Sequence, residues 1–134
     1  MPIVNIVPKS KKVEDALAEK MPELRERVKG AICKISGFPY GDVIVSLCFC
    51  PYRNVDPAAA DLVLYADICP HDQLEVESNV LCSTVAFILA ELGFSSGRGA
   101  EVWNRYLPGP WCLVINGEIV DSVSHPRQQG GQNV

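Results

Sequence analysis

Asp67 is a carboxylate inside an otherwise apolar segment, LVLYADIC (62–69), and a residue in such a setting could take part in acid–base chemistry. The alternative is a carboxylate that faces water or pairs with a Lys or Arg side chain, which is the commoner arrangement for a partly buried acid. The sequence therefore gives Asp67 two interpretations, and we favour the second.

The six cysteines are a second group of reactive side chains. They form no CxxC motif and have no nearby pair of histidines, so we expect no zinc, no other metal and no bound cofactor. Cys48 and Cys50 lie two apart on a predicted strand and share a face, which would allow a metal or redox pair. Packing as small buried hydrophobes is the favoured alternative, and a disulfide framework is not expected in a reducing compartment. The cysteines are Cys33, Cys48, Cys50, Cys69, Cys82 and Cys112.

The composition excludes several classes of protein. The 134 residues suffice for one domain, 1–134, with 48% apolar and 21% charged residues, as in ordinary globular proteins. A net charge of −4, without runs of Lys and Arg among aromatic residues, argues against a nucleic-acid partner. No apolar stretch reaches the ~18 residues of a membrane span, and the N-terminal charges follow the apolar stretch, the reverse of a secretory signal. We therefore expect a cytoplasmic protein with no membrane partner.

Two β-α-β units organise the chain. In the first, over 2–50, the strands PIVNIVP (2–8) and DVIVSLCFC (42–50) flank a helical pattern, and the second strand is apolar on both faces. The same order of elements recurs over 62–107, which is the pattern of a duplication. The elements of this second unit are the strand 62–69, a helix whose apolar stripe runs from Leu74 to Leu92, and the strand AEVWNRYL (100–107).

The helix of the first unit is predicted by apolar residues that recur every three or four positions over 13–35. Ser10 is a candidate N-cap, and Gly37 is a candidate C-terminal stop. Pro22 lies inside this pattern and has two interpretations. It either kinks one long helix, because it cannot donate the backbone hydrogen bond, or it stands in the first turn of a helix that starts there.

The predicted fold class is α/β (an α+β sandwich), with a four-stranded mixed sheet and two helices on one face. A C-terminal β-hairpin is added over 111–123, because Asn116-Gly117 separates two apolar strands, and a loose polar tail follows over 124–134. The other face of the sheet is left bare and apolar. We expect this face to pack in a closed oligomer.

These features resemble the tautomerase superfamily, through Pro2 directly after Met1, a strand that opens at that proline, and duplicated β-α-β units. The chain looks most like longer, two-unit members such as macrophage migration inhibitory factor and carboxymethyl-hydroxymuconate isomerase. It is also similar to bacterial members with a C-terminal aromatic hairpin. The resemblance covers residues 2–121 as architecture, and it implies a homotrimer in which each open sheet faces a central barrel.

The resemblance also implies that Pro2 is a catalytic base once removal of Met1 frees its amine. A free α-amino group has a pKa near 8, and an apolar pocket or a neighbouring cation lowers that pKa, so the neutral amine can take a proton at pH 7. The implied substrate is a small keto or enol acid, held by cations or backbone N–H groups. The alternative for Pro2 is a strand-opening proline with no catalytic role.

Substrate-binding residues follow from the resemblance position by position. Lys12 falls where bacterial members have an arginine in the first loop, and Asn104 matches an asparagine of the inhibitory-factor subgroup. The backbone at Ile68 matches the place where an amide contacts substrate. Phe38 stands where that subgroup has a lysine, so the cation that binds the carboxylate must come from elsewhere.

Arg53, Arg98 and Arg105 are the candidates for that cation by location, and we include Arg105 among the substrate-binding residues. Two functions remain open. One is a tautomerase or isomerase that acts through Pro2 on a small carbonyl or carboxylate compound. The other is a non-catalytic trimer of the same fold that acts as a binding or assembly module.

Overall fold

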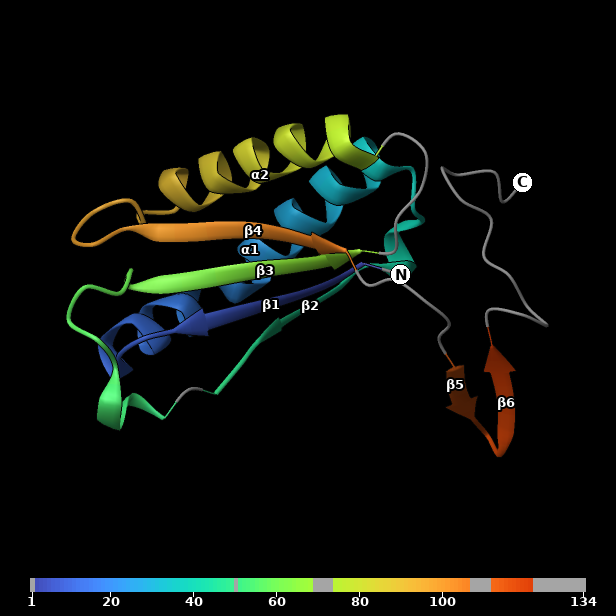
Figure 1. The fold of residues 1–134 in the computed structure, drawn as a ribbon, viewed down its shortest axis with the longest axis horizontal. Helices are drawn as coiled ribbons and strands as arrows, with labels where there is room; N and C mark the ends of the chain where they lie inside the picture. Colours follow the sequence, from blue (N-terminus) through green and yellow to red (C-terminus); the bar gives the residue numbers. More distant parts are fainter. Residues whose placement is uncertain (1, 50, 69–73, 107–111, 122–134) are drawn as a thin grey trace.

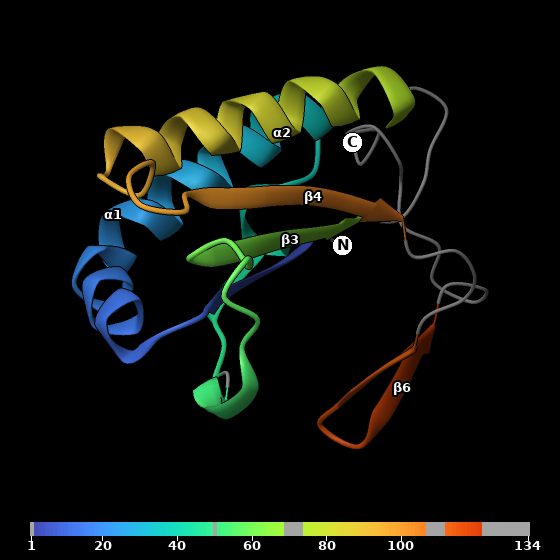
Figure 2. The ribbon, with the colours of Figure 1, turned by 60° about the vertical axis from the view of Figure 1, so that its left-hand side comes forward.

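The computed structural model of the chain describes residues 2–49, 51–68, 74–106 and 112–121. Its main body has two layers, a four-stranded sheet and two α-helices that pack on one face of that sheet (Figures 1 and 2). This is the fold class predicted from the sequence. In chain order the helices and strands are β1 (Ile3–Pro8), α1 (Lys11–Ser36), β2 (Ile44–Leu47), β3 (Leu62–Ile68), α2 (Leu74–Glu91), β4 (Ala100–Tyr106), β5 (Cys112–Ile115) and β6 (Glu118–Asp121). Within the described residues, neither helix combines the length and the apolar character that a membrane crossing requires.

The sheet has the strand order β2-β1-β3-β4, so each β-α-β unit supplies two neighbouring strands. β1 pairs in parallel with β2, and β3 pairs in parallel with β4. The two units meet where β1 pairs antiparallel with β3, from Ile3 opposite Asp67 to Pro8 opposite Leu62. The start of β1 therefore lies beside the end of β3 (Figure 1).

The ends of α1 are fixed by the residues that the sequence predicts for them. The Ser10 hydroxyl accepts a hydrogen bond from the Val13 N–H at 3.2 Å, which satisfies one of the free donors of the first turn. Gly37 has a φ of 79°, and its N–H donates to the Cys33 carbonyl. Pro22 lies inside this continuous helix, which excludes the alternative that the helix starts there.

The hydrophobic core lies between the sheet and the two helices. On the strands it consists of alternate residues, whose side chains all point to the helical face. On α1 its members recur every three or four positions, while most of the charged residues between them are exposed. Side chains of this core with no exposed surface include Val4, Ile6, Leu17, Leu24, Val28, Ile32, Leu64, Ile68 and Val85.

No helix of the described residues lies on the opposite face of the sheet (Figure 2). Ile3 and Val7 of β1 are half-buried there, and Trp103 of β4 is 53% exposed. Ile44 of β2 is exposed as well. We refer to this surface, formed by alternate residues of the four strands, as the open face. Apolar side chains left exposed on one face of a sheet are typical of a surface that associates.

β2 is shorter than the strand predicted over 42–50, and this boundary was wrong. Residues Tyr40–Asp42 form a 3-10 turn, and the strand ends at Leu47. The Phe49 side chain is 80% exposed. The apolar run in the sequence extends beyond the last paired residue of the strand. The sequence pattern does not distinguish an apolar residue in a connector from one in a strand.

The C-terminal strands β5 and β6 pair antiparallel as a separate two-stranded sheet. The turn between them has positive φ at both central residues, 52° at Asn116 and 79° at Gly117. These are the angles of a type I′ turn, for which the Asn-Gly dipeptide is preferred. The tail predicted over 124–134 lies outside the described residues.

Leu64→Ala should lower the free energy of unfolding by about 3 kcal/mol, because it removes buried methyl groups and leaves a cavity in a core position with no exposed surface. Val80 on α2 is 51% exposed, so Val80→Ala is the matched control and should change the free energy by less than about 0.5 kcal/mol. Urea denaturation of both variants measures the difference. Equal losses would contradict the assignment of Leu64 to the core.

Candidate functional site

The edge of the sheet where β1 begins brings together residues that are distant in the sequence. Ile3 is in register with Asp67 of β3, and Asp67 is in register with Arg105 of β4. Because β1 runs antiparallel to β3 and β4, its start meets the ends of both strands. One further step of the same register places Pro2 opposite Ile68. We refer to this part of the sheet, with Pro2, Ile68 and Arg105, as the Pro2 edge.

Pro2 is buried, and its backbone is held in place. Its carbonyl accepts a hydrogen bond from the Ile44 N–H at 3.0 Å. Continued by one residue, the register places Val43 and Ile68 on its two sides, and neither side chain has any exposed surface. Apolar surroundings of this kind favour the neutral form of an amine over the charged form.

Asp67 and Arg105 form a bidentate ion pair near this edge. The Arg105 Nε and Nη2 groups donate to the Asp67 carboxylate oxygens at 2.7 and 2.9 Å. Asp67 is 7% exposed, and the guanidinium lies 4.2 Å from the centroid of the Tyr65 ring. The hydrogen bond to Asp67 raises the pKa of Arg105 above its ordinary value. The favoured interpretation of Asp67, a carboxylate paired with an arginine, is thus confirmed.

Tyr65 is the member of this cluster that the sequence did not single out. It stands two residues before Asp67 on β3, so strand alternation places both side chains on the open face. That spacing is the signal that could have located it. Its contact with Arg105 depends on the register of β3 with β4, which the sequence pattern does not specify.

Asn104 lies at the same end of β4, with its side chain on the helical face. Its amide Nδ2 donates to the Ala66 carbonyl at 3.0 Å, and its Oδ1 accepts a hydrogen bond from the Ser78 hydroxyl at 2.5 Å. These contacts tie β4 to β3 and to α2. In this structure the Asn104 amide therefore fixes the end of β4 against its neighbours at the Pro2 edge.

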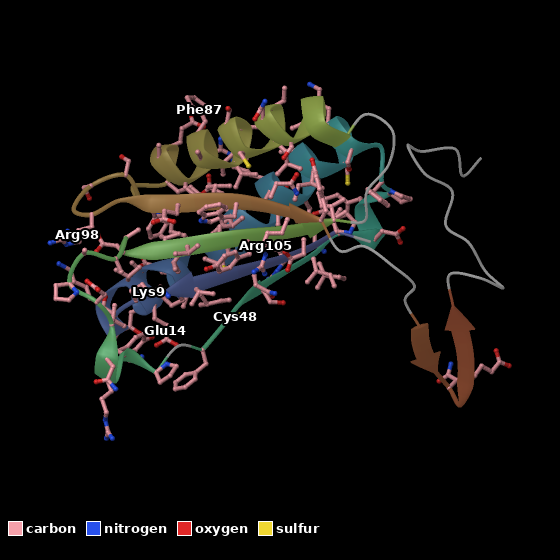
Figure 3. The ribbon with its side chains drawn as sticks, in the orientation of Figure 1. Lys9, Glu14, Cys48, Phe87, Arg98 and Arg105 are labelled. Atoms are coloured by element: carbon pink, nitrogen blue, oxygen red, sulfur yellow. The ribbon has the colours of Figure 1, made fainter. Side chains whose placement is uncertain are left out.

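Three of the cations offered by the sequence lie at the opposite end of the sheet. Arg98 precedes β4, Lys12 lines a cavity of about 350 Å³ beside the start of α1, and Arg53 lines another of about 840 Å³ with Lys9. The six residues of β1 separate the two ends by about 20 Å. Figure 3 shows Lys9 and Arg98 near one end of the sheet and Arg105 farther along it. Of the three candidate arginines, Arg105 is thus the one at the end of the sheet where Pro2 lies.

The described thiols are placed for packing. Cys33 of α1 and Cys82 of α2 are half-buried, and burial raises the pKa of each thiol above its ordinary value. The Cys48 thiol donates to the Asn5 side-chain oxygen at 3.4 Å, and Cys50 lies outside the described residues. In the part of the chain that the structure describes, no three His, Cys, Asp or Glu side chains are grouped as metal ligands.

Comparison with known proteins identifies the fold. No protein-family model matches the sequence, and no curated protein matches it significantly. A fused 4-OT that forms an asymmetric trimer is 17% identical, with a TM-score of 0.60 over 79% of this chain and 86% of that one. N1, of the cis-3-chloroacrylic acid dehalogenase family, is 13% identical, with a TM-score of 0.57 over 80% and 76%. Pt0534, inactivated by 2-oxo-3-pentynoate, is 20% identical, with a TM-score of 0.56 over 80% and 85%. The chain has the fold of the tautomerase superfamily, as the sequence predicted.

A strong reductant and a chelator should leave the melting temperature of the protein unchanged, because we assign the cysteines to packing. Cys33 and Cys82 should also react with a thiol-specific alkylating reagent more slowly in the native protein than in urea, since burial keeps these thiols protonated. Mass spectrometry of the labelled peptides measures the two rates. A fall in melting temperature of about ten degrees with either treatment would show that a disulfide or a metal stabilises the fold.

Proposed function

We propose that this protein is a tautomerase or isomerase in which Pro2, freed by removal of Met1, is the general base acting on a small keto or enol acid. The observation that carries the proposal is the Pro2 edge, where a buried proline, the end of β3 and a fixed arginine lie together. Two proteins of the same fold support the substrate class, since one is inactivated by 2-oxo-3-pentynoate and the other is of a family named for cis-3-chloroacrylic acid.

The proposed reaction is a proton transfer within one substrate molecule. The neutral nitrogen of Pro2 takes the proton of the enol hydroxyl, and the ammonium so formed gives a proton to the neighbouring carbon. The C=C bond becomes a single bond and the C–O bond becomes a carbonyl, so protons and electrons balance. The apolar positions around Pro2, Val43 and Ile68, keep the amine neutral before the step.

Substrate binding is proposed to involve the backbone at Ile68 and the guanidinium of Arg105. Asn104 supports the site indirectly, because its contacts with Ala66 and Ser78 fix β4 against β3 and α2. Lys12 lies at the far end of the sheet of its own chain. It can reach a substrate at Pro2 only if another copy of the protein supplies it.

We propose a homotrimer because the open face leaves apolar side chains uncovered in the single chain. Helices cover one face of the sheet, while Ile3 and Trp103 leave apolar surface on the other. Burial of such surface between copies would stabilise the assembly. The fused 4-OT of the same fold is a trimer.

Protein that lacks Met1 should accelerate the ketonisation of phenylenolpyruvate, measured by ultraviolet absorbance. Pro2→Ala should lower the rate about tenfold or more, because the primary amine is more flexible than the ring nitrogen. A form that retains Met1 should be about 10²-fold slower or inactive, since an amide nitrogen has no available lone pair. Pro8→Ala changes a buried proline at the other end of β1 and should leave the rate unchanged.

Two outcomes would contradict the role of Pro2. Equal rates for the Met1-free, Met1-retaining and Pro2→Ala forms would place any activity elsewhere. A lack of activity in every form, across several keto acids, would favour the non-catalytic binding or assembly module.

Light scattering at micromolar concentration should give about three times the chain mass of 14.6 kDa. Ile3→Asp places a charge on the open face and should lower the measured mass, because the charge would lose its hydration on assembly. Phe87→Asp on the outer surface of α2, where Phe87 is 63% exposed, is the control and should leave the mass unchanged. A monomer that persists at high concentration would exclude the trimer.

A further inference from the structure

The cluster of Tyr65, Asp67 and Arg105 is built more rigidly than an exposed ion pair. One guanidinium binds both oxygens of a carboxylate whose side chain is 10% exposed, and that guanidinium also lies over an aromatic ring. The planar arginine side chain is thus held by two contacts in different directions. The cluster lies on the open face, where Asp67 is in register with Ile3, and Arg105 makes it part of the Pro2 edge.

Arg105 keeps donors that Asp67 does not use. A guanidinium has five N–H groups, of which the two hydrogen bonds to Asp67 occupy two. The remaining three have no hydrogen-bond acceptor among the described residues. In the single chain the Arg105 side chain is 51% exposed near the end of β4, so these donors are accessible to a ligand there. Two strand spacings, about 10 Å, separate the backbones of β1 and β4.

The charge of the cluster limits what it can bind. Asp67 and Arg105 together are neutral, so one carboxylate against the free N–H groups already leaves a net charge of −1 beside Pro2. A second carboxylate would add another negative charge. Within one chain, Arg105 is the only cation among the described side chains on the open face at this edge, so the chain itself supplies no second partner for a dicarboxylate.

We infer that Asp67 and Tyr65 are positioning residues that fix Arg105 to receive a single carboxylate, and that the site selects monocarboxylic over dicarboxylic keto acids. This inference rests on the proposed function for the location of the reacting carbon. It goes beyond that proposal by naming the charge of the substrate. The selectivity comes from Asp67, which cancels the charge of the arginine that it orients.

The test compares three five-carbon ligands by calorimetric titration of the Met1-retaining form. They are 2-oxopentanoate, its methyl ester and 2-oxoglutarate, which differ in charge on one carbon chain. The protein without substitutions should bind 2-oxopentanoate at least about tenfold more tightly than either of the other two ligands. Arg105→Gln should weaken binding of 2-oxopentanoate about tenfold and leave the ester unchanged.

Asp67→Asn is the decisive variant, because it keeps the side-chain shape and frees the charge of Arg105. Its preference for 2-oxopentanoate over 2-oxoglutarate should fall at least about fivefold, an effect that loss of structure alone would not produce. Glu101→Gln removes a carboxylate from the same strand, where Glu101 accepts a hydrogen bond from the Trp103 ring nitrogen, and should leave the preference unchanged. Tyr65→Leu should weaken the binding of 2-oxopentanoate about threefold and retain the preference for it over 2-oxoglutarate. Tyr65→Phe should bind 2-oxopentanoate as tightly as the unsubstituted protein does.

Thermal melting and light scattering of each variant accompany the titrations. An unchanged preference in Asp67→Asn would overturn the inference. So would an equal loss of acid and ester binding in Arg105→Gln, or a change in mass with no change in carboxylate affinity, since each would give the cluster a structural role only.

Failure of the inference and failure of the proposed function are distinguishable. The expected binding pattern without turnover in any form would support the role of Arg105 and exclude Pro2 as a base. Turnover that depends on Pro2, with the same KM for 2-oxopentanoate enol in Arg105→Gln, would support the base and exclude the proposed role of the cluster.

Discussion

The antiparallel pairing of β1 with β3 is the interaction on which the rest of the structure depends. It joins two parallel β-α-β units into one sheet and sets Ile3 opposite Asp67. Without it, the start of β1 would not meet the ends of β3 and β4, and Pro2 would lie far from Arg105. A slip of one residue would turn every side chain of β1 to the other face, so burial of Val4 and Ile6 fixes this register.

The position of both helices on one face has a second consequence. It buries the apolar stripes of α1 and α2 in a single core and leaves the open face with a mixture of apolar and polar side chains. Asp67 is tolerated on that face because Arg105 satisfies both of its oxygens. The same ion pair that makes a carboxylate acceptable in an apolar strand also holds a cation near Pro2.

Much of the fold was predictable, because its signals are local. Ser10 and Gly37 mark the ends of α1 through their own backbone and side-chain chemistry, and alternating or helical spacing located four strands and two helices. The end of the second strand was predicted wrongly at 50, since the exposed Phe49 continues an apolar pattern beyond the pairing. Helix continuity at Pro22 also needed the structure, because packing of the whole stripe overrides the cost of one missing hydrogen bond.

By itself the sequence determined the two β-α-β units, the mixed four-stranded sheet and Asp67 as an unusual carboxylate, because residue type and spacing carry that information. Only the tertiary structure decided which distant residues meet. It placed Arg105 at the same end of the sheet as Pro2 and put Arg53, Arg98 and Lys12 at the other end, although the sequence does not distinguish these cations. The reason is physical: strand order and register depend on long-range burial, and no local pattern encodes them.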